Sequence, residues 1–154
     1  MNLSTHLAVG AAVGYATKNP ILGFFAGVLS HHLIDQIPHS DGGSLNISVD
    51  NFTKDKRIIA IVATDFILLV VVAYLLLSHV GVYWPMILGG FGGVLPDLID
   101  NMPYWTPRLR KIYPFNYYHQ FHEKFHFTIM NEDFIWVGVI IQLLITGAML
   151  TILL

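Results

Sequence analysis

The sequence SHHLIDQIPHSD, residues 30–41, ends a long apolar run and places three histidines and two aspartates within twelve residues. If the run is helical, His31 and Asp35 lie four residues apart and face the same side. Pro38 should end the helix, which places His39 just beyond its last turn. Imidazole nitrogens and carboxylate oxygens on adjacent turns are typical ligands of zinc or iron. This stretch therefore predicts one part of a metal site whose other ligands come from elsewhere in the chain.

The composition is typical of a membrane protein. Of the 154 residues, 55% are hydrophobic and 12% are charged, whereas soluble domains carry about 25% charged residues. The length fits a single domain covering residues 1–154. Because the chain has no cysteine, any metal must be held by histidine and carboxylate. The net charge of −2 is uninformative about nucleic acid, and no basic run is dense enough to suggest such a partner.

Apolar runs separated by polar turns predict an all-α bundle of about five helices. The expected helices cover residues 4–17, 20–37, 58–77, 84–101 and 133–154. The third and the last are long enough, at about 1.5 Å per residue, to cross about 30 Å of hydrocarbon. The aromatic and basic segment 102–131 suits the headgroup region of a bilayer. We therefore expect a polytopic membrane helical bundle.

Small residues mark the faces along which the first two helices should pack. Gly10 and Gly14 lie four residues apart in the first helix, and Gly23 and Gly27 do so in the second. Faces of this kind allow two helix backbones to approach closely. We therefore expect these two helices to form a tight hairpin.

The second and fourth helices have similar sequences. The matching pairs are ILGFFAGVL (21–29) with ILGGFGGVL (87–95), and LIDQIP (33–38) with LIDNMP (98–103) after a one-residue slip. We interpret this similarity as a duplicated helical hairpin, with copies at about 4–39 and 58–103, followed by a C-terminal span at 133–154. Chance similarity between apolar helices rich in glycine and leucine is the alternative interpretation.

Alternation of the helices across a bilayer would bring the candidate metal ligands to one side. The first, third and last helices leave that side, and the second and fourth return to it. The candidates gathered there are His6, His31, Asp35, His39, Asp65, Asp97, Asp100, His122 and His126. Most lysines and arginines fall on the same side. By the positive-inside rule we expect a site on the cytoplasmic face of an integral inner-membrane protein.

Individual residues admit competing interpretations. Asp65 lies inside a span, where an ionised carboxylate costs about 2.5–3.5 kcal/mol, so it needs a partner. We expect a metal role, and a neutral acid bonded to a neighbouring helix is the alternative. His32 points about 100° away from His31, which indicates a supporting role. Asp41 is interpreted as a loop residue. The candidates for binding a substrate phosphate are Arg108, Arg110, Lys111 and His119. For the basic cluster 108–111 the alternative is anchoring at the membrane, and for His119 it is a metal ligand or a bond to the backbone.

Together these segments resemble the YdjM-type membrane-bound metal-dependent hydrolases and, more distantly, the zinc-dependent phospholipase C group. The matching parts are STH at 4–6, GVLSHHLIDQIPH at 27–39, GGVLPDLID at 92–100 and the late histidine cluster. Where the family usually shows His-Arg-Gly followed by Thr-His-Ser, residues 119–128 read HQFHEKFHFT. The resemblance implies metal-dependent hydrolysis of a phosphoester at a membrane.

We therefore expect a membrane-embedded hydrolase of a phospholipid or other phosphoester that works through a metal-activated water. The candidate ligands suffice for one or two divalent ions, zinc first and manganese or iron as alternatives, and paired ions lie about 3.5–4 Å apart in phosphoester hydrolases. The candidate catalytic residues are Asp35, Asp65, Asp97 and His122. HQFH and HEKFH also fit a histidine-box di-iron oxidase or desaturase. A third interpretation is a non-enzymatic metal carrier or membrane adaptor.

Overall fold

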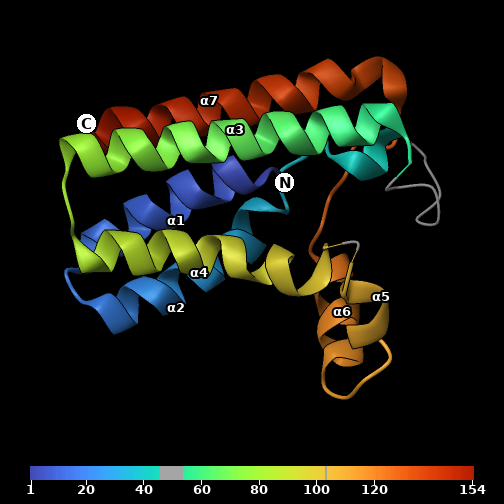
Figure 1. The fold of residues 1–154 in the computed structure, drawn as a ribbon, viewed down its shortest axis with the longest axis horizontal. Coiled ribbons are helices and arrows are strands. Elements are labelled where there is room, and N and C mark those ends of the chain that lie inside the picture. Colours follow the sequence, from blue (N-terminus) through green and yellow to red (C-terminus); the bar gives the residue numbers. More distant parts are fainter. Residues whose placement is uncertain (46–53, 103) are drawn as a thin grey trace.

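The protein is a bundle of helices (Figure 1), described by a computed structural model over residues 1–45, 54–102 and 104–154. The long helices are α1 (Leu3–Thr17), α2 (Pro20–Ile34), α3 (Lys56–His79), α4 (Trp84–Asp100) and α7 (Ile135–Leu153). Two short helices, α5 (Thr106–Leu109) and α6 (Phe115–Lys124), occupy the aromatic and basic segment. The all-α prediction is confirmed for the described residues. Residues 46–53 of the expected polar loop and Pro103, at the end of the second proposed copy, lie outside them.

Local signals in the sequence explain where α2 begins and ends. The Asn19 side chain accepts hydrogen bonds from the backbone N–H groups of Ile21 and Leu22 at 3.0 and 3.1 Å, and Pro20 fits the first turn. The helix ends at Ile34, earlier than the predicted residue 37. Asp35 nevertheless keeps a helical conformation, and its N–H donates to the His31 carbonyl at 3.0 Å. The predicted spacing of these two side chains over one turn is therefore preserved.

The packing places α1 in the middle of the bundle. It contacts α2 and α4 on one side and α3 and α7 on the other, and α3 and α7 run side by side in Figure 1. The glycine faces of α1 and α2 both lie against α4. A Cβ atom built on Gly14 would lie 2.8 Å from the Gly89 Cα atom, and one built on Gly27 would overlap the Gly89 carbonyl oxygen. The α1–α2 hairpin forms, but glycine allows close approach to α4 rather than between its own two helices.

The helices of the two proposed copies have different packing partners. In the first copy α1 packs on α2, whereas in the second α3 packs against α1 and α7, and α4 packs between α1 and α2. The expectation of two equivalent hairpins therefore receives no support from the packing.

Two segments are long and apolar enough to cross a membrane by length and composition, namely Lys56–His79 and Glu132–Leu153. Helices α1, α2 and α4 have 15, 15 and 17 residues and are shorter than the roughly 20 residues of a full span. Within the described ranges the structure thus confirms five long helices but gives only two candidate spans. The predicted polytopic membrane bundle of about five helices is therefore confirmed as helical, whereas its membrane-spanning character is not confirmed beyond these two candidates.

Candidate metal centre

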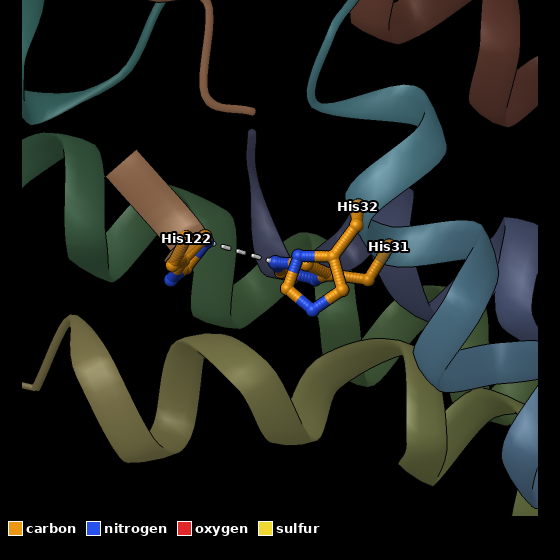
Figure 2. Close-up of side chains that lie close together, drawn as sticks. All are labelled: His31, His32 and His122. Carbon is orange, nitrogen blue, oxygen red and sulfur yellow. Dashed lines mark hydrogen bonds between the residues drawn. The ribbon is translucent and has the colours of Figure 1, made fainter. Parts of the chain in front are cut away.

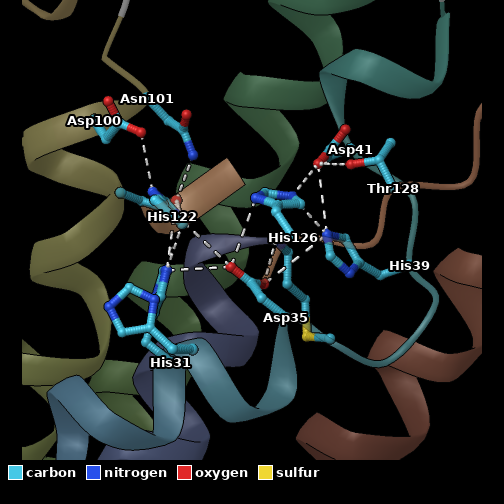
Figure 3. A network of polar contacts seen from close by, with 12 residues as sticks. His31, Asp35, His39, Asp41, Asp100, Asn101, His122, His126 and Thr128 are labelled. Carbon is cyan, nitrogen blue, oxygen red and sulfur yellow. Dashed lines mark hydrogen bonds and ion pairs between the residues drawn. The ribbon is translucent and has the colours of Figure 1, made fainter. Parts of the chain in front are cut away.

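The C-terminal ends of α2 and α4 meet helix α6 in a buried group of histidines and aspartates (Figure 3). Four of these residues each offer one ligand atom, and the four atoms lie within 4.8 Å of one another. We call this set the inner cluster: His31, Asp35, Asp97 and His122. All four residues are buried, with at most 4% of each accessible to solvent. The sequence predicted every member as a ligand, and the structure brings all four together.

The distances within the inner cluster fit a small divalent ion. His31 Nε2 lies 3.2 Å from Asp35 Oδ2 and 3.1 Å from His122 Nε2. His122 Nε2 lies 3.5 Å from Asp35 Oδ2, and Asp97 Oδ1 lies 3.9 and 3.8 Å from the two imidazole nitrogens. Ligand atoms bonded to a tetrahedral zinc at about 2.0–2.1 Å are about 3.3 Å apart. Two of the five distances would have to lengthen slightly, and the two to Asp97 would have to shorten by about 0.5 Å, to reach this geometry.

The hydrogen bonds of the two imidazole rings leave their Nε2 atoms with lone pairs. His31 Nδ1 lies 2.8 Å from the Gly93 carbonyl oxygen and His122 Nδ1 lies 3.1 Å from Asp100 Oδ2. Both partners are acceptors, so each Nδ1 must donate, and in a neutral ring Nε2 then carries the lone pair. The two Nε2 atoms face each other at 3.1 Å (Figure 2). Two facing lone pairs repel unless a cation or a proton lies between them.

The proton is the natural competitor of a metal ion at this position. Burial alone would lower the pKa of His122, but its contacts with Asp100 and Asp35 raise the pKa to about 9. At neutral pH the ring therefore holds an extra proton when no metal is bound. Because a ligating imidazole must be neutral, metal binding has to release this proton.

Buried polar atoms without hydrogen bonds add a second indication of a cation. Within the described part of the chain, Asp35 Oδ2 and both ring nitrogens of His6 are buried without a hydrogen-bond partner. His6 Nε2 lies 3.1 Å from Asp35 Oδ1 and 3.5 Å from Asp97 Oδ2, and its ring stacks on His31 with centroids 3.8 Å apart. Buried polar atoms are normally paired, so unpaired ones at a histidine–carboxylate cluster fit metal ligands.

A second group of possible ligands lies on the other side of Asp35. We call Asp35, His39 and His126 the outer cluster, in which one ligand atom from each again lies within 4.8 Å of the others. Two chain segments are paired to build it. The Phe127 N–H donates to the Asp35 carbonyl and the Ile129 N–H to the His39 carbonyl, both at 2.8 Å. This pairing holds His126 beside His39, as the sequence predicted for two ligands of one site.

Asp65 does not join either cluster. Its Oδ2 accepts from the Leu3 N–H at 2.7 Å, and its Oδ1 accepts from the Ser4 N–H at 3.0 Å and the Ser4 hydroxyl at 2.6 Å. These are unpaired groups at the first turn of α1, where a carboxylate is also favoured by the helix dipole. Asp65 is thus bonded to a neighbouring helix, as the alternative interpretation expected, but it accepts all three hydrogen bonds and none of them shows a neutral acid. It lies outside the two clusters, contrary to its predicted metal and catalytic role.

Asp100 lies behind His122 instead of beside the ligand atoms of the inner cluster. Its Oδ2 accepts from His122 Nδ1 at 3.1 Å and from His119 Nδ1 at 2.9 Å. Arg110 donates to its Oδ1 at 3.0 Å and to its backbone carbonyl at 2.6 Å. A carboxylate on the far nitrogen of a ligating histidine fixes the ring and raises its basicity. Two residues predicted to bind phosphate, Arg110 and His119, are therefore bonded to Asp100.

Asp100, His119 and Glu123 also come close enough to form a possible metal group of their own. The arginine on Asp100 disfavours a cation there because it already neutralises the carboxylate. The remaining predicted phosphate ligands, Arg108 and Lys111, are exposed on the surface.

His32 lies beside the inner cluster and, with His31 and His122, could also offer a ligand atom. Its ring lies against those of Phe121 and His122, with centroids 5.0 and 5.5 Å away (Figure 2 labels His31, His32 and His122). His32 thus packs α2 against α6 and holds His122 in place from the side.

Three residues of this region were not singled out as functional from the sequence. Asp41 accepts from His126 Nε2 at 2.8 Å and from the Thr128 hydroxyl at 3.0 Å, so it is more than a loop residue. Asn101 donates to Asp97 Oδ1. Gln142, buried on α7, donates to the Ser40 carbonyl and accepts from the Asn2 N–H, both at 2.7 Å. Of these, only Gln142 had a visible signal, a lone amide inside an apolar helix.

Comparisons of the chain with protein-family models, with curated proteins and with solved structures found no match.

Proposed function

We propose that this protein is a membrane-embedded, metal-dependent hydrolase that acts on a lipid phosphoester, in line with the resemblance to YdjM-type hydrolases. The observation that carries the proposal is the inner cluster, in which two imidazole lone pairs and two aspartates converge on a volume the size of a zinc ion. Such a set is typical of hydrolytic metal sites, which combine histidine with carboxylate ligands.

The residues of the inner cluster would hold the ion, and each has a defined supporting contact. Gly93 and Asp100 fix the rings of His31 and His122, and Asn101 fixes Asp97. When bound, a metal ion at such a site lowers the pKa of a water molecule and neutralises charge on phosphoryl oxygens. The chain itself supplies rigid orientation and exclusion of bulk water, since the four residues are almost fully buried.

The surface of the bundle supports a membrane location. Large apolar side chains are exposed along α3 and α7, for example Phe66 at 61%, Tyr74 at 69% and Leu144 at 68%. Exposed apolar surface of this extent is costly in water and is expected where lipid tails surround a helix. The candidate metal centre lies at the end of the bundle where α3 and α7 begin, next to α5 and α6 (Figure 1). This arrangement supports a location of the clusters at a membrane face, and the basic residues there favour the cytoplasmic one.

Substrate recognition is assigned to the exposed basic residues beside the centre. Arg108 and Lys111 remain exposed, whereas Arg110 is bonded to Asp100. A phosphate group near the membrane would be attracted by both positive charges.

One competing function has a specific structural feature in its favour. A carboxylate shared between two histidine-containing groups, as Asp35 is here, also occurs in di-iron oxidases that use carboxylate bridges. The hydrolase is favoured because the inner cluster combines its two histidines with two aspartates, while histidine-box enzymes rely chiefly on histidine. The experiment below separates the two.

The test is made on the full chain, purified in detergent without chelator. Elemental analysis measures bound metal, and release of phosphate or headgroup from short-chain phospholipids measures hydrolysis, with and without a chelator and after addition of Zn²⁺. We expect hydrolysis that is lost with the metal and restored by Zn²⁺ without oxygen. Oxygen-dependent turnover with bound iron would support the oxidase instead, and hydrolysis that persists without metal would refute the proposal.

Matched variants link that activity to the inner cluster. Asp97→Asn removes one ligand oxygen and preserves the shape of the side chain, and Asp133→Asn makes the same change at an exposed aspartate. The first variant should lose most of its activity, while the second should match the wild type.

A further inference from the structure

Asp41 lies at the exposed edge of the outer cluster and uses its two carboxylate oxygens differently. Oδ1 accepts from the Gly43 N–H at 2.7 Å and so stabilises the turn that follows. Oδ2 points toward the imidazole rings, 2.8 Å from His126 Nε2 and 3.5 Å from His39 Nε2 (Figure 3). The Thr128 hydroxyl donates to the same oxygen at 3.0 Å. Oδ1 thus stabilises the turn, and Oδ2 faces the outer cluster.

The ring of His39 turns a lone pair toward the outer cluster, whereas His126 Nε2 donates to Asp41 and must lose that proton to bind an ion. His39 Nδ1 lies 2.8 Å from the Ile37 carbonyl oxygen, which can only accept, so His39 Nε2 carries a lone pair in the neutral ring. That atom lies 2.9 Å from His126 Nε2 and 3.9 Å from Asp35 Oδ1. Together with the two distances from Asp41 Oδ2, these distances between candidate ligand atoms range from 2.8 to 3.9 Å. Ligand atoms of a tetrahedral zinc are expected to be roughly 3.3 Å apart.

Asp41 has the charge that a ligand needs, because an aspartate is ionised at neutral pH. Its hydrogen bond from Thr128 is the kind of outer contact that orients a ligating carboxylate.

We propose that Asp41 is a metal ligand, and that Asp35, His39, Asp41 and His126 hold a second divalent ion next to the ion of the inner cluster. Asp35 is shared by both clusters, with Oδ2 3.2 Å from His31 Nε2 and Oδ1 3.9 Å from His39 Nε2. Oδ1 also accepts from the Met1 ammonium group at 2.9 Å, so the second ion would take the place of this buried positive charge. The proposal rests on the proposed function in one respect, since it requires the inner cluster to bind the first ion.

The two ions should differ in how readily they exchange. The inner ligands come from α2, α4 and α6 and are almost completely buried, whereas the side chains of Asp41 and His126 are 21% and 11% exposed. His39, Asp41 and His126 also come from connecting segments instead of helices. A site on less rigid, more exposed segments releases its ion faster. The outer ion should therefore be the first that a chelator removes.

The experiment counts zinc on the full chain in detergent, after equilibration with Zn²⁺ and removal of free ion. We expect about two Zn²⁺ per chain for the wild type, in keeping with a two-metal site. Asp41→Asn keeps an oxygen for the Gly43 N–H and replaces the facing oxygen by an amide, so it should fold and bind about one Zn²⁺. Asp133→Asn is the control and should bind as many ions as the wild type.

Thr128→Val provides a second variant that retains every ligand atom. It removes the hydroxyl that orients Asp41, so the second ion should leave at about 10-fold or more lower chelator concentration while the first is unaffected. If Asp41→Asn still binds two ions, or if the wild type binds only one, the proposal is wrong. Failure of the proposed function is distinct, because then the wild type binds no zinc or binds it without any metal-dependent hydrolysis.

Discussion

Replacing Asp65 by asparagine tests whether this residue stabilises the start of α1, as the structure indicates, or binds a metal ion, as the sequence suggested. The carboxylate accepts three hydrogen bonds from Leu3 and Ser4 at the start of α1. Asparagine retains one acceptor oxygen and turns an N–H₂ group toward a backbone N–H. The change removes a hydrogen bond to a charged group, worth about 1.5–3 kcal/mol, and a charge at a helix N-terminus, worth about 0.3–2 kcal/mol.

Together these losses predict a destabilisation of about 2–4 kcal/mol, since the two contributions overlap. For a chain of this length that corresponds to a fall in Tm on the order of 5–15 °C. Thermal unfolding in detergent, followed by circular dichroism, measures the shift. Thr64→Val, at the exposed neighbouring position on α3, is the control and should change Tm little. Zinc content should stay at the wild-type level, and a variant that lost zinc without a fall in Tm would show that Asp65 is a ligand after all.

Three further predictions address the support of the centre and the packing around it. Asp100→Asn should weaken zinc binding about 10–100-fold without changing its stoichiometry, because His122 loses the carboxylate that orients it. Equilibrium competition with a chelator measures the affinity. Zinc binding should release a proton and tighten as the pH rises toward 9, because the raised pKa of His122 keeps its ring protonated below that pH. Calorimetry in buffers of different ionisation enthalpy counts the released proton. Zinc binding that does not depend on pH would contradict this prediction. Gly89→Ala should destabilise the bundle by about 1–3 kcal/mol or more, because a Cβ atom there would lie 2.6 Å from the Gly14 Cα atom. The control is Gly147→Ala, where a Cβ atom would meet no other atom within 4 Å. This variant should leave the stability of the protein unchanged or slightly higher.

The sequence was sufficient to predict the parts of the site that depend on helix geometry. The spacing of His31 and Asp35 places both on one face, and alternation of the helices brings Asp97 to the same end of the bundle. These relations follow from the rise per residue and from short connections. They require no knowledge of how the helices rotate against one another.

The parts that the sequence did not predict depend on packing between distant segments. Asp65 meets the start of α1 because α3 lies directly beside that helix, a placement that depth in the membrane does not determine. Asp41 gains its role only because residues 126–129 pair with residues 35–39. The similarity of LIDQIP to LIDNMP suggested that Asp35 and Asp100 are equivalent. In the structure Asp97 completes the inner cluster, and Asp100 supports it from behind.

We propose that His31, Asp35, Asp97 and His122 together hold a metal ion. Asp35→Asn tests it most directly, because this residue is shared by the inner and outer clusters. The measurement is the zinc content of the folded full-length variant beside that of the wild type and of Asp133→Asn, after equal exposure to Zn²⁺. The wild type and Asp133→Asn should hold zinc tightly, and Asp35→Asn should hold almost none while keeping its helical content. Zinc content in Asp35→Asn equal to that of the wild type would contradict the claim.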